Sequence, residues 1–398
     1  PGREADWRRT LSQLLHVRAT VEQIVSPRPG VVRLKNVRLA DLRSGRPLCA
    51  LGEIRAQWRG PQLTLVADEL RVEAESFSTL ATTLATWLSA TELPAVDLQA
   101  RRLTIVGSSQ QTLSLLHVRV QSERPTAQTQ QLALQAILPA AERGGATHTL
   151  RLVVRQHEKL TTATLDTDTA RLPSWLLADL LPSFARCAGA KFTGSVRLEG
   201  NAQEVSGSLQ GRLEYLTIND WLGPDSPHRV RGIAHVELEQ LTWRGDRVVT
   251  AHGNLYAANG AIGHSLLLDV IKRFYCVPGP LVELKTNSVE KMQSFDELAC
   301  EFHITSEGIT LTGKCASLAD SAPGCMLTID GRPLLMEPTY ANLPVAQLVQ
   351  VLSQPASSWL PASQEAHAMA GKLPLPSVGS QTPKEVATRP DRNAHSLK

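Results

Sequence analysis

Aromatic residues are scarce in this sequence. Only 4% of its 398 residues are Phe, Trp or Tyr, although 42% are hydrophobic. The apolar side chains are therefore mostly Leu, Val and Ala, whereas a compact enzyme of this length usually has more rings around its pocket. An elongated, repetitive β structure needs fewer rings. Runs of about 18 consecutive apolar residues are also absent, so no membrane-spanning helix and no signal peptide are predicted within the sequence.

The sequence also lacks a clear excess of either positive or negative residues. Lys and Arg number 41 against 38 Asp and Glu, which gives a formal net charge of +3. The basic residues are interleaved with acidic ones instead of forming a patch. Arg33, Arg102, Arg119 and Arg151, for example, stand beside apolar strand positions, as solvated residues on an outer face do. These features argue against a nucleic-acid partner.

The motifs of common metal sites are missing. The six cysteines form no CxxC pair, and no histidine stands near them at a metal-ligand spacing, so a structural zinc site is not expected. Four of the six lie between Cys276 and Cys325. This clustering permits a disulfide in an oxidising compartment, and buried free thiols are an equally good interpretation. The sequence leaves the pairing open.

Catalytic motifs are equally hard to find. The segment GSLQG at residues 207–211 has its serine in the wrong place for a nucleophile elbow, and GHSLL at residue 263 lacks the closing glycine. No P-loop, HExxH or dinucleotide-binding fingerprint occurs. The histidines are dispersed, and a single histidine in a strand is more often structural than catalytic. We therefore expect no enzyme, no catalytic residue, no bound metal and no cofactor.

The dominant pattern is alternation of apolar and polar residues with a period of two, which is typical of strands with one buried face. It predicts an antiparallel sheet with an apolar and a polar face. The alternating apolar positions include Val32 and Leu34, Leu63 and Leu65, Val96 and Leu98, Leu116 and Val118, Leu132 and Leu134, Leu150 and Leu152, Val196 and Leu198, Leu209 and Leu213, and Val236 and Leu238.

Several of these runs change phase part-way along. The apolar positions shift between Leu34 and Val37, and again between Leu98 and Leu103. A phase change within one strand implies a β-bulge or a crossover between faces, and repeated phase changes favour a long, coiled sheet over a flat sandwich. The predicted fold class is therefore mainly β: a long, twisted antiparallel sheet curled into an open groove, with a few short amphipathic helices.

Helical spacing of apolar residues appears in five short segments, namely 5–15, 77–89, 173–184, 264–274 and 341–352. In the third, Pro173 occupies a suitable first helical position. Because short amphipathic helices need a surface to cover, we interpret them as plugs at the ends of the β core, with direct membrane contact as the alternative. After about residue 353 the chain is rich in Pro, Ser and Gln and is expected to be disordered. The predicted divisions are an N-terminal β-groove segment (1–168), a C-terminal β segment (169–332), and a short helix with its tail (333–398).

Three stretches resemble the AsmA-like family of bacterial envelope proteins, the AsmA/TamB/YhdP type with a repeating β-groove. Residues 11–48 resemble the family's start, in which a helix, a strand and a Pro-Gly turn precede Val32, Leu34, Val37 and Leu39. Residues 172–200 are similar to a helix-to-strand joint between repeats. Residues 253–313 resemble the AsmA-type C-terminal region. The matching positions there are Gly253, Leu255, Gly260, Gly263, the helix from Leu266, Phe295, Leu298, Phe302, Ile304, Gly308, Ile309 and Leu311.

The resemblance implies a protein that binds or transfers lipid in the bacterial envelope and contributes to phospholipid transport or outer-membrane assembly. It further implies a periplasmic location, an inner-membrane anchor formed by a transmembrane helix that precedes this sequence, and envelope protein partners. A curled sheet offers its apolar concave face to acyl chains. The alternative is an extracytoplasmic scaffold with a self-packed β core. The residues expected to line the groove are Val196, Leu198, Leu209, Val236 and Leu238.

Overall fold

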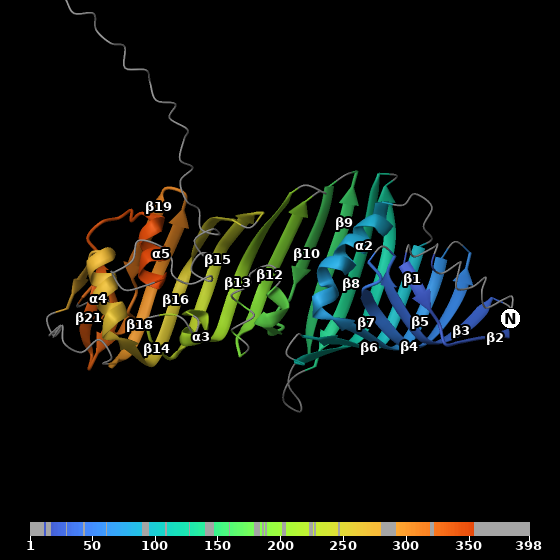
Figure 1. Cartoon of the computed structure of the whole chain (residues 1–398), viewed down its shortest axis with the longest axis horizontal. Coiled ribbons are helices and arrows are strands. Elements are labelled where there is room, and N and C mark those ends of the chain that lie inside the picture. Colours follow the sequence, from blue (N-terminus) through green and yellow to red (C-terminus); the bar gives the residue numbers. More distant parts are fainter. Residues whose placement is uncertain are drawn as a thin grey trace, which may run out of the picture.

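The structure is a computed structural model that describes Ser12 and most of residues 17–353. Gaps within this range fall at residues 29, 43, 61, 90–94, 108–109, 127, 140–146, 159, 179–183, 185–186, 188, 201–203, 223–225, 227, 246, 280–291 and 319–321. The described residues form one 21-stranded sheet that runs the length of the molecule (Figure 1). The predicted helix at 5–15, apart from Ser12, and the predicted disordered tail lie outside the described residues.

The first half of the sheet contains the strands up to β10, each paired with its neighbour in sequence from β3 onward. β1 and β2 both pair with β3 on its outer side. The strands are β1 (Val17–Thr20), β2 (Gln23–Arg28), β3 (Val31–Asp41), β4 (Pro47–Arg59), β5 (Gln62–Glu73), β6 (Ala95–Val106), β7 (Thr112–Thr126), β8 (Thr129–Leu138), β9 (His148–His157) and β10 (Leu160–Asp166).

The second half continues the same sheet because β10 pairs with β12. From there the order is β12, β13, β15, β16 and β18, with short strands at the rims. The strands are β11 (Leu172–Pro173), β12 (Lys191–Gly200), β13 (Val205–Thr217), β14 (Val230–Arg231), β15 (Ile233–Arg244), β16 (Arg247–Gly263), β17 (Cys276–Pro278), β18 (Met292–Thr305), β19 (Gly308–Gly313), β20 (Cys325–Ile329) and β21 (Arg332–Pro338).

The predicted fold class is confirmed: the protein is mainly β, and its sheet does not close into a barrel. Within the described chain, no pairing joins the first strands to the last. One detail differs from the predicted antiparallel pattern, because β5 and β6 are parallel. A parallel connection needs a crossover, and the helix α2 (Phe77–Ser89) supplies it.

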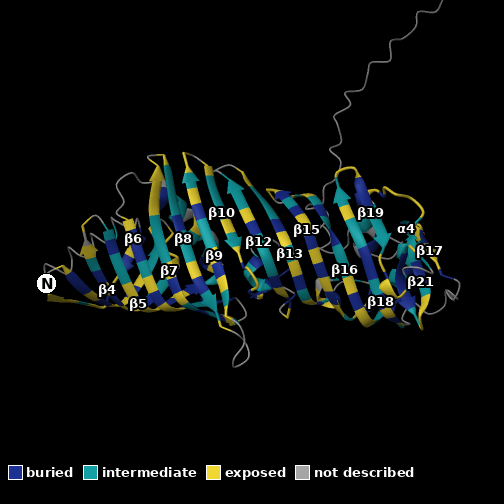
Figure 2. Ribbon diagram, turned by 180° about the vertical axis from the view of Figure 1, so that it is seen from behind, coloured by how far each residue is buried: buried dark blue, intermediate teal, exposed yellow. Residues whose placement is uncertain are grey.

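The longer helices lie on one face of the sheet, and the opposite face is bare strand (Figures 1 and 2). α2 contacts β3 and β4 on one side and β8 and β9 on the other. Since β4 and β8 are far apart in strand order, the sheet must curve around this helix to form a trough. α4 (His264–Arg273) and α5 (Val345–Ser353) contact each other over the last strands of the sheet.

Three of the predicted helices match α2, α4 and α5. The prediction for 173–184 is wrong at its start, because Pro173 is extended and pairs with Lys191 as part of β11. The 3₁₀ turn η2 (Ser174–Leu177) follows, and residues 179–183 lie outside the described residues. A short rim strand tolerates proline, which has no amide hydrogen for a ladder. The described part of the chain also contains α3 (Ile218–Leu222) and the 3₁₀ turns η1 (Ala74–Ser76) and η4 (Ala316–Leu318).

The predicted phase changes correspond to left-handed residues that lie on one line across the sheet. Asn36 has φ 50° and falls between the pairs Lys35–Glu53 and Val37–Leu51. His117, with φ 49°, falls opposite Arg101 between the pairs of β6 with β7. The register is the same on both sides of each position, so neither residue is inserted as in a β-bulge. The buried positions shift in the paired strands together, from Leu34 to Val37 in β3 and from Ile54 to Leu51 in β4. The change of phase therefore coils the sheet without breaking its apolar face.

Glycines produce the corresponding coiling in the second half. Gly194 and Gly211 pair with each other across β12 and β13 at φ 150° and 147°. A Cβ on either would collide with the backbone of the other strand. Farther along, the rings of Trp243 and Phe295 cover Gly207 and Gly260. In each pair the aromatic ring fills the space that is left because glycine has no side chain.

Candidate functional site

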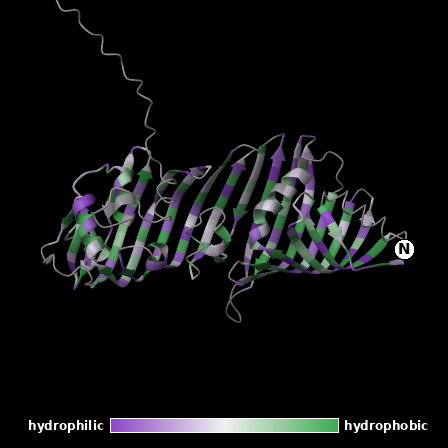
Figure 3. Ribbon diagram, viewed as in Figure 1, coloured by the Kyte–Doolittle hydropathy of each residue, from purple (hydrophilic) through white to green (hydrophobic). Residues whose placement is uncertain are grey.

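One continuous row of apolar side chains crosses the inner face of the sheet from β3 to β19. Each member pairs directly with the next across neighbouring strands. We call it the apolar row. Its members, in order, are Val32, Ala56, Leu65, Leu98, Val120, Leu134, Leu152, Leu165, Val196, Leu209, Leu241, Ala251, Ile304 and Ile309. The alternation of apolar and polar positions along each strand that produces it is visible in Figure 3.

The apolar row is not equally covered along its length. From β5 to β10 its six leucine and valine side chains, Leu65 to Leu165, are partly exposed. They lie between two hydrophobic clusters, one built on the inner side of β3 to β9 and the other where Trp87 and Leu88 of α2 meet the sheet. Solvent therefore reaches an unbroken apolar strip in the first half of the trough.

The residues predicted to line the groove lie in the second half, where the protein's own side chains cover them. Val196, Leu209, Val236 and Leu238 face inward but are only 3%, 1%, 9% and 7% exposed. Leu198 is partly buried against the same cluster. The predicted face is therefore the inner one, but in this structure these four positions have almost no surface left for a ligand.

The covering of the second half comes from loops and helices that pack onto the inner face. The large cluster that contains Val196 and Leu209 also includes Leu177 and Phe184 of the β11–β12 connection, Leu267 of α4, and Val351 of α5. Burying side chains of this size contributes about 1.5–3 kcal/mol each. This part of the trough is a packed core.

His228 fixes α5 to the rest of this cover. Its ring is fully buried, its Nε2 lies 2.6 Å from the carbonyl oxygen of Val351, and its Nδ1 lies 3.1 Å from Ser265 Oγ of α4. A carbonyl only accepts, so Nε2 carries the hydrogen and Nδ1 accepts from the serine hydroxyl. Burial lowers the pKa of His228, against the opposing effects of the Val351 carbonyl and Asp269. The ring is therefore neutral and acts as a hydrogen-bonding link between helices.

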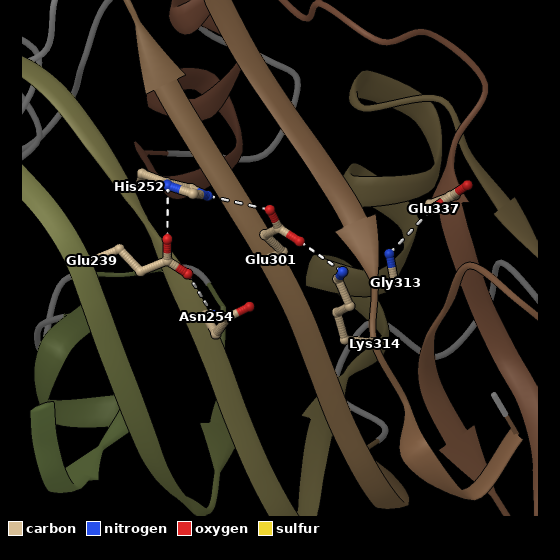
Figure 4. Close-up of polar contacts among 7 residues, drawn as sticks. All are labelled: Glu239, His252, Asn254, Glu301, Gly313, Lys314 and Glu337. Atoms are coloured by element: carbon tan, nitrogen blue, oxygen red, sulfur yellow. Dashed lines mark hydrogen bonds and ion pairs between the residues drawn. The ribbon is translucent and has the colours of Figure 1, made fainter.

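The outer face of the second half carries a chain of polar contacts instead of an apolar surface (Figure 4). His252 lies 3.2 Å from both Glu239 and Glu301, and Lys314 Nζ lies 2.7 Å from Glu301. The hydrogen bond from Lys314, followed by that from His252, lowers the pKa of Glu301, and the same carboxylate raises the pKa of Lys314. These contacts join strands β15, β16 and β18 on the solvent side, where such ion pairs stabilise only weakly.

The cysteines are all thiols, and burial makes several of them poor nucleophiles. Burial raises the pKa of Cys49, Cys276 and Cys300 to about 12. Because the thiolate is the reactive form, these groups stay protonated and unreactive at neutral pH. The disulfide that the sequence left open is absent, since all six cysteines are described and none is bonded to another. Among described residues no group of three or more His, Cys, Asp or Glu is arranged to hold a metal ion.

Comparison with known proteins finds no matching family model and no matching curated protein. The resemblance to the AsmA-like family therefore stays a prediction. No helix in the described part of the chain combines the length and the hydropathy needed to cross a bilayer.

The division predicted at residue 168 also stays a prediction. The sheet runs across it without interruption through the pairing of β10 and β12, although the two largest hydrophobic clusters separate nearby, between Leu172 and Leu177. The last predicted segment is not separate in packing, because Leu334 of β21 and Val345 of α5 belong to the cluster of the second half.

Proposed function

We propose that this chain is a non-enzymatic lipid-binding protein that holds acyl chains along the exposed part of the apolar row. The observation that carries the proposal is the unbroken, partly exposed strip from Leu65 to Leu165. Five strand-to-strand spacings of about 4.8 Å make this strip about 24 Å long. One leaflet of a bilayer core is about 15 Å thick, so a fatty acyl chain fits along the strip.

The energetics of the strip suit a ligand without a specific pocket. Each acyl methylene removed from water contributes about 0.8 kcal/mol, and Leu and Val side chains provide contact without polar groups that would need partners. The sheet keeps its polar face toward water, so the lipid headgroup can stay in solvent at the rim. The resemblance to AsmA-like proteins agrees with this chemistry. On this basis we infer a chain in the periplasm, tethered to the inner membrane, that contributes to phospholipid transport or outer-membrane assembly.

Two neighbouring residues of β5 provide a matched test. Leu65 belongs to the apolar row, whereas Val66 is 47% exposed on the outer face. We expect phospholipid to co-purify with the wild-type chain and with V66D, and the amount to fall several-fold in L65D, because a carboxylate in the strip repels hydrocarbon. Extracted lipid per mole of protein is measured by mass spectrometry, with thermal melting as the folding control. Equal lipid in L65D and V66D, or none in the wild type, contradicts the proposal.

The second candidate function is an extracytoplasmic scaffold with a self-packed core. The burial of Val196, Leu209, Val236 and Leu238 favours it, because the second half of the trough has no comparable exposed strip at those positions. The scaffold function predicts that the purified chain carries no lipid. It also predicts that an envelope protein co-purifies with the tagged wild type and, in equal amount, with tagged L65D. Measuring co-purified lipid therefore separates the two functions.

A further inference from the structure

A polar pocket opens at the rim of the second half, away from the apolar row. Its volume is about 530 Å³, and it lies where α3 and the end of β13 approach β14 (Figure 1). The residues that line it are Thr217, Asn219, Asp220, Ser226, His228, Arg229, Val230, Arg231 and Gly232. The two arginines in this lining belong neither to the apolar row nor to the packed core.

The two arginines are placed by a rigid backbone. Arg229 accepts a hydrogen bond from Gly263 N at 2.8 Å, and Val230 and Arg231 pair with β16. Val230 is 2% exposed, so it points into the core. Residues two apart on a strand share a face, which puts the side chains of Arg229 and Arg231 together on the solvent side, about 7 Å apart at their Cα atoms.

The base and the opposite wall of the pocket are also fixed. The ring of His228 is held by Val351 and Ser265, and its amide donates to Ser226 Oγ at 3.2 Å. The amide of Ile218, beside Thr217, donates to the carbonyl of Gly232 at 3.4 Å, which ties the wall from β13 and α3 to the wall from β14. The backbone that carries the two arginines and the opposite wall of the pocket are therefore held in place by hydrogen bonds.

Neither guanidinium has a hydrogen-bond or ion-pair partner within the described part of the chain, whereas Arg212, Arg244 and several other arginines of the sheet do. A guanidinium presents a planar set of donors that matches the oxygen atoms of a phosphate. Asn219, Thr217 and Ser226 add neutral donors. Asp220 contributes one negative charge, which suits a ligand that carries an ammonium group beside its phosphate.

We propose that this pocket binds a phosphate ester, with Arg229 and Arg231 holding the phosphate and Asp220 facing a positively charged substituent. The source of the ester is either a phospholipid headgroup or a small soluble molecule. The first source rests on the proposed lipid-binding function, and the second does not.

The test uses the full chain, R229Q/R231Q, and the control R247Q/R332Q, whose arginines are exposed and do not line the pocket. The soluble probe is glycerophosphoethanolamine, titrated by calorimetry. The lipid probes are a phosphatidylethanolamine and a diacylglycerol with identical fluorescent acyl chains. We expect R229Q/R231Q to bind at least one phosphate-bearing probe about tenfold more weakly than the wild type, as loss of charge-assisted hydrogen bonds predicts, and R247Q/R332Q to bind it normally.

The pattern across the probes separates the sources and the two proposals. Binding of both lipids, with only the phospholipid weakened in R229Q/R231Q, assigns the pocket to a lipid headgroup. Binding of the soluble ester while neither lipid binds keeps the pocket but rejects the lipid-binding function. If R229Q/R231Q matches R247Q/R332Q with every probe, or if the wild type binds no phosphate ester, the pocket proposal is wrong.

Discussion

The two halves of the sheet carry the same apolar row but cover it differently. Up to β10, the row members from Leu65 to Leu165 are partly exposed, and the helix α2 lies in the trough beside them. From β12 onward, Val196 and Leu209 of the row are buried in a large cluster that also contains residues of the β11–β12 connection, α4 and α5. An apolar strand face therefore does not decide by itself whether a trough is open, because the segments that connect the strands decide it.

The backbones of the two halves share one feature and differ in another. Left-handed residues that keep their side chains occur within strands of both, such as Asn36 and His117 in the first half and Tyr215 and Asn259 in the second. The second half also has the pair Gly194 and Gly211, where the strands approach so closely that no side chain fits.

The largest expected difference between the halves concerns core truncation in the apolar row itself. L209A creates a cavity at a position that is 1% exposed and should lower the free energy of unfolding by about 3–5 kcal/mol. L134A, at a partly exposed position of the same row, should lower the free energy of unfolding by about half as much, since water or neighbouring side chains can fill the space. Urea unfolding followed by tryptophan fluorescence measures both. Equal losses would show that the two halves are packed alike.

The glycines sharpen the comparison of how each half coils. G211A places a methyl group against the backbone of β12 at φ 147° and should destabilise by about 2–3 kcal/mol. A Cβ on Gly52 of β4 would meet no described atom within 4 Å, so G52A should be neutral or stabilise by up to about 1 kcal/mol. Thermal melting of the two variants suffices. A G211A protein as stable as G52A contradicts the proposed role of the glycine pair.

Much of this fold could be predicted from the sequence, because its period-two pattern and its helix stripes are local signals. The phase change between Leu34 and Val37 marked the position of the left-handed residue Asn36, but it is not a bulge, because the register of β3 and β4 is continuous there. The parallel pairing of β5 and β6 could not be predicted, since it depends on the path of α2. The choice of Val196 and Leu209 as lining residues identified the inner face, but their burial results from tertiary packing in a large cluster, which the alternation along a strand does not show.

The rim pocket and the His228 link were missed for a similar reason. Arg229 and Arg231 read as ordinary charged residues beside a short apolar run, and His228 as one of eleven dispersed histidines. Only the pairing of β14 with β16 and the approach of α3 reveal the pocket. The spacing of two arginines around one buried valine was the available signal, and it is too common to be specific.

The attachment of α5 to the second half of the sheet should depend on pH, because His228 links α5 to α4. Because burial lowers its pKa in the folded protein, the unfolded chain binds the proton more readily. The contribution of neutral His228 to the stability of the fold is complete above about pH 6.5, the pKa of histidine in an unfolded chain. It is lost as the pH falls through and below that value. H228F removes both hydrogen bonds and should cost about 1–3 kcal/mol at neutral pH, with faster amide exchange in α5. H303F, on the outer face, is the control. Unchanged exchange in α5 of H228F contradicts the link.

The smallest expected effect is on the outer face. E301Q removes the ion pair with Lys314 and the contact with His252, and should lower stability by less than about 1 kcal/mol because these groups are solvated. The pKa of Glu301 is lowered in the folded state, so its contribution is present above about pH 4.5 and is lost as the pH falls. Melting temperatures of the wild type and of E301Q, measured at pH 7 and at pH 3.5, give the loss of stability at each pH. A larger loss at pH 3.5 than at pH 7 would contradict this sign.

The central claim is that acyl chains occupy the strip from Leu65 to Leu165. It is tested most directly by incubating the unmodified protein with a phospholipid that carries a diazirine in its acyl chain, irradiating it, and mapping the adducts by mass spectrometry. The account predicts adducts on inner-face residues of β5 to β10, including Leu134 and Leu152. Adducts that are absent, or that fall only on the outer face or on the covered strands β12 to β16, would contradict it.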